Sequence, residues 1–123
     1  MPAMVTLDEE RGIRITSAVG PMRWVDFLEI YRMIAGDPSL SSVKRTLVDL
    51  RHASLAGVTR ADVQAAVHLP KLPREVDTRM AIVTKSPVVY GISRMYAMMQ
   101  VIRQTGEVKV FGTLDEAMAW LVQ

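Results

Sequence analysis

The stretch Arg45-Thr46-Leu47-Val48-Asp49-Leu50 decides the fold class. It is a compact apolar run of strand length, which is typical of a strand in the middle of a parallel sheet. A second run of this kind covers residues 79–84 and is centred on Ala81-Ile82-Val83, after a segment whose apolar residues have helical spacing. Two buried strands with a helix between them indicate a βαβ unit, and therefore an α/β protein.

Toward the N-terminus, the sequence predicts a hairpin. Residues 4–8 form a short strand, and Arg11-Gly12 is a turn signal. Next, Ile13 and Ile15 alternate with the polar residues Arg14 and Thr16, which indicates a second strand with one buried face.

Four helices are predicted from their start signals. Gly20-Pro21 should open the first, because proline is tolerated in a first helical turn. Thr59 can cap the second, Ser86-Pro87 should open a long third helix that Gly106 terminates, and Thr113 begins a capping box for the last. The residues that should dock this last helix are Ala117, Trp120 and Leu121.

With a final strand near residues 108–111, the order of elements is β-βα-βα-βα-βα. It predicts an α/β single-domain βα superhelix over residues 1–123, with a mostly parallel five-stranded sheet and an antiparallel N-terminal strand. A chain of 123 residues, 50% of them hydrophobic, can bury a core without a disulfide or metal.

The composition excludes several kinds of chemistry. The chain has no Cys and two His, so we expect neither thiolate catalysis nor a metal centre, and no cofactor. The glycine and serine spacings of phosphate loops, dinucleotide fingerprints and nucleophile elbows are missing, so no enzyme is predicted. Without a signal-peptide pattern or a long apolar stretch, we expect a cytoplasmic protein, with peripheral contact to the inner membrane face as a further option.

The net charge of +2 is unevenly distributed. Residues 51–106 carry eight Lys or Arg against three Asp or Glu. This basic middle fits an anionic ligand, an acidic partner or an anionic membrane surface, but also scattered solvated charge. No Lys/Arg run with interleaved aromatic residues occurs, so nucleic acid is not predicted as a partner.

Candidate ligand-binding residues gather where the carboxyl ends of parallel strands meet helix N-termini. Arg51 and His52 follow the first buried strand, and Lys85 and Ser86 precede the long helix, whose N-terminus favours an anion. The simpler interpretation is that Ser86 only caps the helix and that Lys85 is solvated. His52 is the residue on which a hydrolase hypothesis would rest, yet no catalytic constellation surrounds it in the sequence.

The long helix has apolar residues on two faces. The stripe predicted to be buried consists of Val88, Ile92, Met95, Tyr96, Met99 and Ile102. A second strip, broken by Arg94, consists of Tyr90, Ala97, Met98 and Val101. This second strip is either core packing or a contact surface. Tyr90 and Arg94 are candidates for ligand binding, and the candidate interface residues are Tyr90, Met98 and Val101.

Several segments together resemble a known family. They are Val19-Gly20-Pro21, Thr46 to Arg51, Arg79 to Val83, Tyr90 to Tyr96, and the closing stretch Val110 to Leu121 with its Asp115-Glu116-Ala117. Over nearly the whole chain they resemble the bacterial STAS/SEC14-type family, also called SpoIIAA-like. The resemblance implies a βα superhelix related to STAS and to lipid-carrying CRAL-TRIO domains, with roles in ligand binding, membrane contact or regulation and no established catalysis.

One segment departs from the STAS pattern. STAS anti-sigma-factor antagonists carry an Asp-Ser-Ser-Gly-Leu run at the start of their second helix, and its serine is phosphorylated. The corresponding stretch here is Ala56-Gly57-Val58-Thr59-Arg60, with Val58 at the phosphorylated position. We therefore expect neither the phosphoserine switch nor a sigma-factor partner.

Two hypotheses about function remain. The leading one is a non-enzymatic binding module for a small apolar or lipidic ligand with an anionic end, or for an anionic membrane surface. The alternative is a homodimeric, STAS-type protein-interaction domain that binds no ligand.

Overall fold

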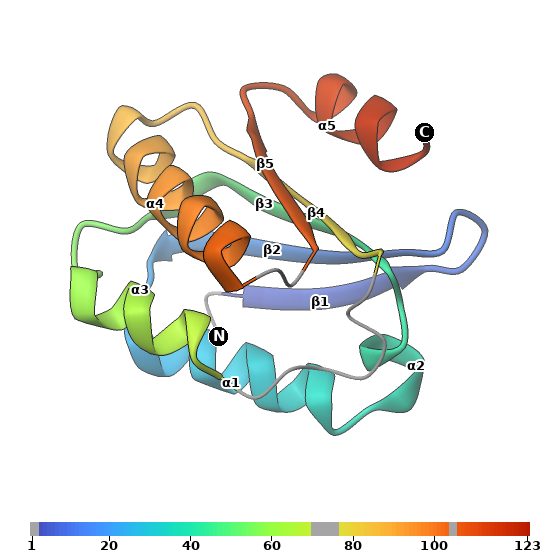
Figure 1. Ribbon diagram of the computed structural model, residues 1–123, viewed down its shortest axis with the longest axis horizontal. Coiled ribbons are helices and arrows are strands. Elements are labelled where there is room, and N and C mark those ends of the chain that lie inside the picture. Colours follow the sequence, from blue (N-terminus) through green and yellow to red (C-terminus); the bar gives the residue numbers. More distant parts are fainter. Residues whose placement is uncertain (1–2, 70–76, 104–105) are drawn as a thin grey trace.

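The computed structural model describes residues 3–69, 77–103 and 106–123, without the side chains of residues 99–103. Its elements alternate along the chain (Figure 1). They are β1 (Ala3–Asp8), β2 (Ile13–Pro21), α1 (Trp24–Ala35), α2 (Pro38–Ser41), β3 (Arg45–Ser54), α3 (Arg60–Val67), β4 (Arg79–Val83), α4 (Pro87–Arg103), β5 (Glu107–Phe111) and α5 (Leu114–Leu121).

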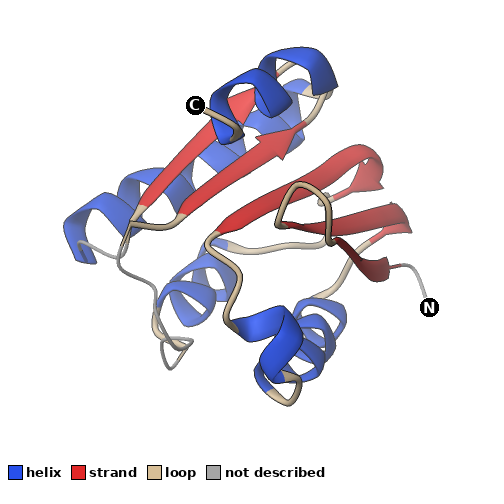
Figure 2. Cartoon of the chain, turned by 90° about the vertical axis from the view of Figure 1, so that its right-hand side faces the viewer, coloured by secondary structure: helices blue, strands red, loops and turns tan. Residues whose placement is uncertain are grey.

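The strands form one five-stranded sheet in the order β1-β2-β3-β4-β5. β1 is antiparallel to β2, and the other neighbours are parallel. The predicted fold class is thereby confirmed. Because each right-handed crossover advances the order by one strand, the connecting helices fall on the same face of the sheet. Of the described helices, α1, α3 and α4 cover that face, and α5 covers the other (Figure 2).

Each face of the sheet carries its own hydrophobic core. The core under α1 and α4 consists of Ala18, Met22, Ile30, Ile34, Leu50, Leu55, Ile82 and Val89. The core under α5 consists of Ile13, Leu47, Ala81, Val83, Ala117, Trp120 and Leu121. The docking residues predicted for the last helix are therefore confirmed. β4 contributes to both cores, which explains its continuous apolar sequence.

The first long helix begins later than the sequence predicted. Gly20 and Pro21 belong to β2, where they pair with Ala53 and Ser54 of β3. Gly20 has a φ of +79°, a conformation that glycine adopts at little steric cost. α1 starts only at Trp24. The prediction was wrong because it read Gly-Pro as a helix start, whereas pairing with β3 extends the strand.

β3 is also longer than predicted, and a short helix was missed. The strand continues through Ser54, so Arg51 and His52 lie within it and not in a loop. The missed helix is α2, whose first turn is capped by Asp37, since Oδ1 of Asp37 accepts a hydrogen bond from the Ser39 backbone N–H at 3.0 Å.

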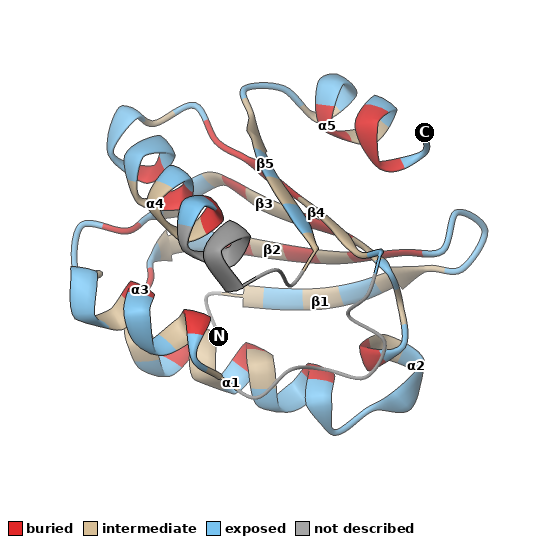
Figure 3. Cartoon of the chain, in the orientation of Figure 1, coloured by how far each residue is buried: buried red, intermediate tan, exposed pale blue. Residues whose placement is uncertain are grey.

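The buried face of α4 differs from the predicted stripe by about one residue. Val88 is 59% exposed, whereas Val89 is 1% exposed and lies in the core. Ser93 and Ala97 are also buried, so Ala97 belongs to the core face and not to the second strip. Figure 3 shows the buried part of α4 turned toward the sheet. Of the predicted stripe, Met99 and Ile102 lie outside the described side chains.

Candidate ligand-binding cavity

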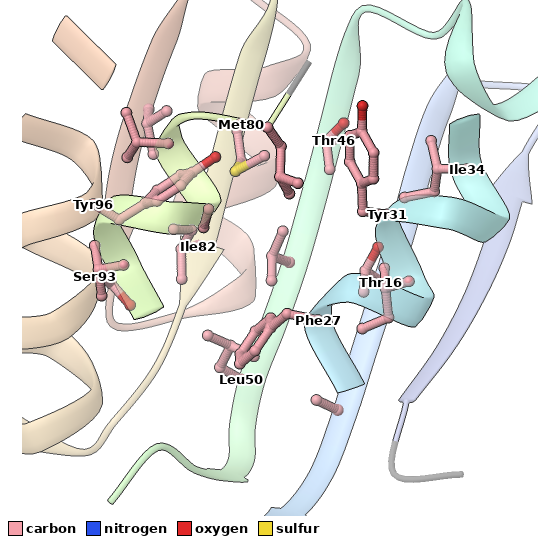
Figure 4. Close-up of a pocket in the computed structure, with 18 of the residues that line it drawn as sticks. Thr16, Phe27, Tyr31, Ile34, Thr46, Leu50, Met80, Ile82, Ser93 and Tyr96 are labelled. Atoms are coloured by element: carbon pink, nitrogen blue, oxygen red, sulfur yellow. The ribbon is translucent and has the colours of Figure 1, made fainter. Parts of the chain in front are cut away.

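A cavity of about 300 Å³ lies between the sheet and the three helices α1, α3 and α4. Its floor includes Thr16, Val48 and Ile82, which are register partners on β2, β3 and β4. Phe27 and Tyr31 of α1 and Ser93 and Tyr96 of α4 face it from the two sides (Figure 4). This volume is at the lower end of the range for small-molecule sites.

The packing of the helices explains why the sheet is not completely covered here. α1 packs against α2 and β1, while α3 packs against α4. α3 has only eight residues, and it presents Val63, Ala66 and Val67 to the cavity. These small side chains do not reach far across β3, so space remains between the helices and the central strands.

One end of the cavity is polar. Arg14 of β2 is 6% exposed, and its Nη1 donates a hydrogen bond to the backbone carbonyl of Leu40 at 2.8 Å. Thr46 on β3 is the register partner of Arg14, and Thr16 lies two residues further along β2. These two threonines are also buried, as is Ser41 of α2. All four line the cavity, so a positive charge and three hydroxyl groups surround this end.

The other end is apolar. Figure 4 shows Tyr31 and Thr46 together at one end of the cavity, with Phe27 and Leu50 at the other. The apolar end is completed by Ala18, Met22, Leu55, Val58 and Val63. The lining of the cavity therefore changes from polar to apolar along the direction of the strands.

Two carboxylates in the lining have described partners of their own. Asp62 caps α3, because its Oδ2 accepts a hydrogen bond from the Thr59 backbone N–H at 3.0 Å. Glu107 lies on β5 with a side chain that is 60% exposed, and its Oε1 is 4.0 Å from Nε of Arg79. Both groups lie away from β2, on α3 and β5.

The structure places Arg51 on the sheet face opposite the cavity. Its Nε and Nη2 donate to Oδ1 and Oδ2 of Asp49, each at 2.9 Å. These side chains alternate with those of Val48 and Leu50, which line the cavity. The hydrogen bonds from Arg51 hold the pKa of Asp49 below its ordinary value. His52, the neighbouring candidate, is exposed and does not line the cavity among the described residues.

We expect Arg51→Met to raise the pKa of Asp49 and to make stability less dependent on pH. Because the folded-state pKa of Asp49 is lowered, the ion pair stabilises the protein above the unfolded value of about 3.9. This contribution disappears as the pH falls through the lower folded value. Urea unfolding should show the variant less stable at pH 7, and the difference should be smaller near about pH 2. An equal difference at both pH values would contradict this account.

The other predicted candidates lie outside the described lining of the cavity. Oγ of Ser86 accepts a hydrogen bond from the Val89 backbone N–H at 3.3 Å, as expected of a helix cap, and Lys85 is exposed. Tyr90, Arg94 and Met98 are exposed on the outer face of α4. The side chain of Val101 lies outside the described residues. As ligand or interface residues, these stay predictions.

Sequence reasoning missed Arg14, Thr16 and Thr46. The alternation of Arg14 and Thr16 with Ile13 and Ile15 predicted a solvent-facing side of β2, and this prediction was wrong. β2 is covered on both faces, so Arg14 and Thr16 are 6% and 5% exposed. The available signal was the predicted position of β2 next to a central parallel strand, where both faces are normally buried.

The described residues include no cluster of three or more His, Asp or Glu that could hold a metal ion. Neither histidine is among the described lining residues of the cavity. Within the described part of the chain, no helix is both long and apolar enough to cross a membrane.

The strand order, the antiparallel β1 and the helix placement define a SpoIIAA-like fold. A DUF3478-family protein of unknown function from Shewanella loihica, with a SpoIIAA-like fold, matches at a TM-score of 0.59 and 16% identity, over 97% of this chain and 91% of that one. An anti-sigma factor antagonist from Mycobacterium paratuberculosis matches at a TM-score of 0.56 and 18% identity, over 98% and 93%. At these identities the likeness concerns the fold. No family model and no curated protein match the sequence.

Proposed function

We propose that this protein is a non-enzymatic binding module that takes a small, mainly apolar molecule into the cavity beneath α1 and α3. The observation that carries the proposal is the cavity itself, about 300 Å³ lined largely by apolar side chains. Filling such a space with a ligand removes apolar surface from water on both partners, which favours binding. The sequence hypothesis of a binding module is kept, but its site moves from the strand ends to this cavity.

A regulatory role fits the same site. The anti-sigma factor antagonist of similar fold is by its name a regulatory protein. A ligand between the sheet and α1, α3 and α4 would bias the arrangement of these helices, and such a bias can alter a protein contact. We therefore propose that ligand occupancy regulates a protein partner of this chain.

Native mass spectrometry of freshly purified protein, followed by denaturing extraction, tests the proposal. A retained small molecule that is lost on denaturation would support it and name the ligand class. A ligand-free dimer would instead favour the alternative, a homodimeric interaction domain using the outer face of α4. The fraction released should also be scanned for lipids.

Ala66→Phe should weaken binding of a neutral apolar probe, 1-decanol, by about tenfold or more. Ala66 lines the cavity, so a phenyl ring at this position takes up space that the ligand needs. Ala65→Phe is the matched control, because the neighbouring residue on the same helix is exposed. Isothermal titration calorimetry measures both. Equal losses in the two variants, or none in either, would argue against the cavity as the binding site.

A further inference from the structure

We infer that the ligand of the cavity is an uncharged single-chain alcohol, and that Thr16 and Thr46 bind its hydroxyl group. This inference rests on the function proposed above and adds the chemical class of the ligand and its orientation. It follows from a cluster of buried hydroxyl groups at one end of a mainly apolar cavity.

The hydroxyl groups of the lining are the first argument. Thr16, Thr46 and Ser41 line the cavity and are 5%, 6% and 6% exposed. The hydrogen bonds among the described residues include none to these three hydroxyl groups. A buried hydroxyl without a partner costs free energy, which a hydrogen-bonding group of a ligand offsets. A molecule that fills the cavity without such a group leaves the hydroxyls unpaired, so the site should select against it.

The charges of the lining are the second argument. Two arginines and two carboxylates are among its described residues, so their formal charges cancel. Asp62 caps α3, and Glu107 forms an ion pair with Arg79. Arg14 donates to the Leu40 carbonyl at 2.8 Å and has a further interaction within the protein. A charged ligand would lose its hydration here without meeting a net opposite charge, whereas a hydroxyl group leaves water at a much smaller cost.

The arrangement of polar and apolar residues is the third argument. Thr16 and Thr46 come from the neighbouring strands β2 and β3. Because a hydroxyl group both donates and accepts, an alcohol bound there accepts from one threonine and donates to the other. From this end the cavity continues to Phe27 and Leu50 (Figure 4). The apolar chain of the alcohol would lie there, and a volume of about 300 Å³ suits one chain better than two.

Calorimetry with 1-octanol and 1-fluorooctane tests the inference, because fluorine is close to a hydroxyl group in size but forms only weak hydrogen bonds. Thr16→Val and Thr46→Val each replace the hydroxyl with a methyl group and keep the branched shape of the side chain. Each variant should bind 1-octanol about fivefold more weakly and 1-fluorooctane within about twofold of the wild type. Thr6→Val is the matched control, because Thr6 is exposed on β1 and is not among the described lining residues. It should change neither affinity.

Urea unfolding of the ligand-free proteins separates a binding role of the two threonines from a structural one. Since the described residues form no hydrogen bond with either hydroxyl, Thr16→Val and Thr46→Val should be at least as stable as the wild type. A lower urea midpoint for either variant would mean that its hydroxyl supports the fold, and would overturn its assignment to the ligand.

The remaining outcomes distinguish the inference from the proposed function. Octanoate should bind more weakly than 1-octanol, and tighter binding of octanoate would overturn the uncharged class. If the valine variants weaken 1-octanol and 1-fluorooctane equally, or weaken neither, the assignment of Thr16 and Thr46 is wrong and the proposed function still stands. Binding of none of these probes to the wild type would overturn both.

Discussion

Replacing Trp120 with alanine should lower the free energy of unfolding by about 3–5 kcal/mol. Trp120 is 8% exposed and holds α5 on the sheet. Its ring centroid is 5.6 Å from that of Phe111, and Arg79 and Lys109 approach the ring at 5.4 and 5.2 Å. Truncation therefore removes a large apolar contact, an aromatic pair and two cation–π contacts together.

Urea unfolding monitored by circular dichroism measures this loss. Trp24→Ala is the control, because Trp24 is only half-buried and lies at the cavity on the other face of the sheet. We expect a smaller loss for that variant. A loss below about 1 kcal/mol for Trp120→Ala would mean that α5 contributes little to the stability of the sheet.

The sheet could be predicted from the sequence because strand composition reports burial. Residues 81–83 are continuously apolar, and Leu47, Val48 and Leu50 form a dense apolar group in the other strand, which is typical of strands covered on both faces. The capping residue Thr59 marks the start of α3 correctly, since its hydroxyl accepts a hydrogen bond from the Asp62 backbone N–H at 3.1 Å. These signals act within a few residues along the chain, so they do not depend on tertiary structure.

The predictions that were wrong concern features of the structure that tertiary contacts determine. Val88 and Val89 are equivalent in the sequence, and only the packing of α4 on the sheet selects Val89 for the core. Likewise, Gly20-Pro21 can start a helix or end a strand. In this protein the two residues end β2, because they pair with Ala53 and Ser54 of β3. Local sequence patterns do not contain this information.

The candidate site was beyond sequence reasoning for a related reason. The cavity exists because α1 and α3 pack on different neighbours, and no residue pattern encodes the space between two helices. Arg14 drew no attention because an arginine in an alternating strand normally faces solvent. Its significance comes from its burial, which only the structure shows.

The conformation of Gly106 carries the second large effect. Gly106→Ala should destabilise the protein by about 2–5 kcal/mol, combining backbone strain with a steric clash. Gly106 has a φ of +104°, which an alanine adopts only with strain. An added Cβ would also lie 2.9 Å from the carbonyl oxygen of Thr78 and would overlap the hydroxyl of the same residue. The Thr78 side chain can rotate away, but its backbone carbonyl is held by a hydrogen bond from the Glu107 N–H at 3.0 Å.

Gly112→Ala is the matched control for this substitution, because Gly112 flanks the other end of β5. A Cβ there would meet no atom within 4 Å, so the change in stability should stay within about 0.5 kcal/mol. Equal urea midpoints for the two variants would show that the contact between Gly106 and Thr78 does not constrain the start of β5. Since Thr78 and Glu107 both line the cavity, Gly106→Ala should also weaken 1-decanol binding at temperatures where the variant is still folded. The reason is that the strain acts where β4 and β5 begin, at the edge of the cavity, so stability and binding depend on the same backbone contact.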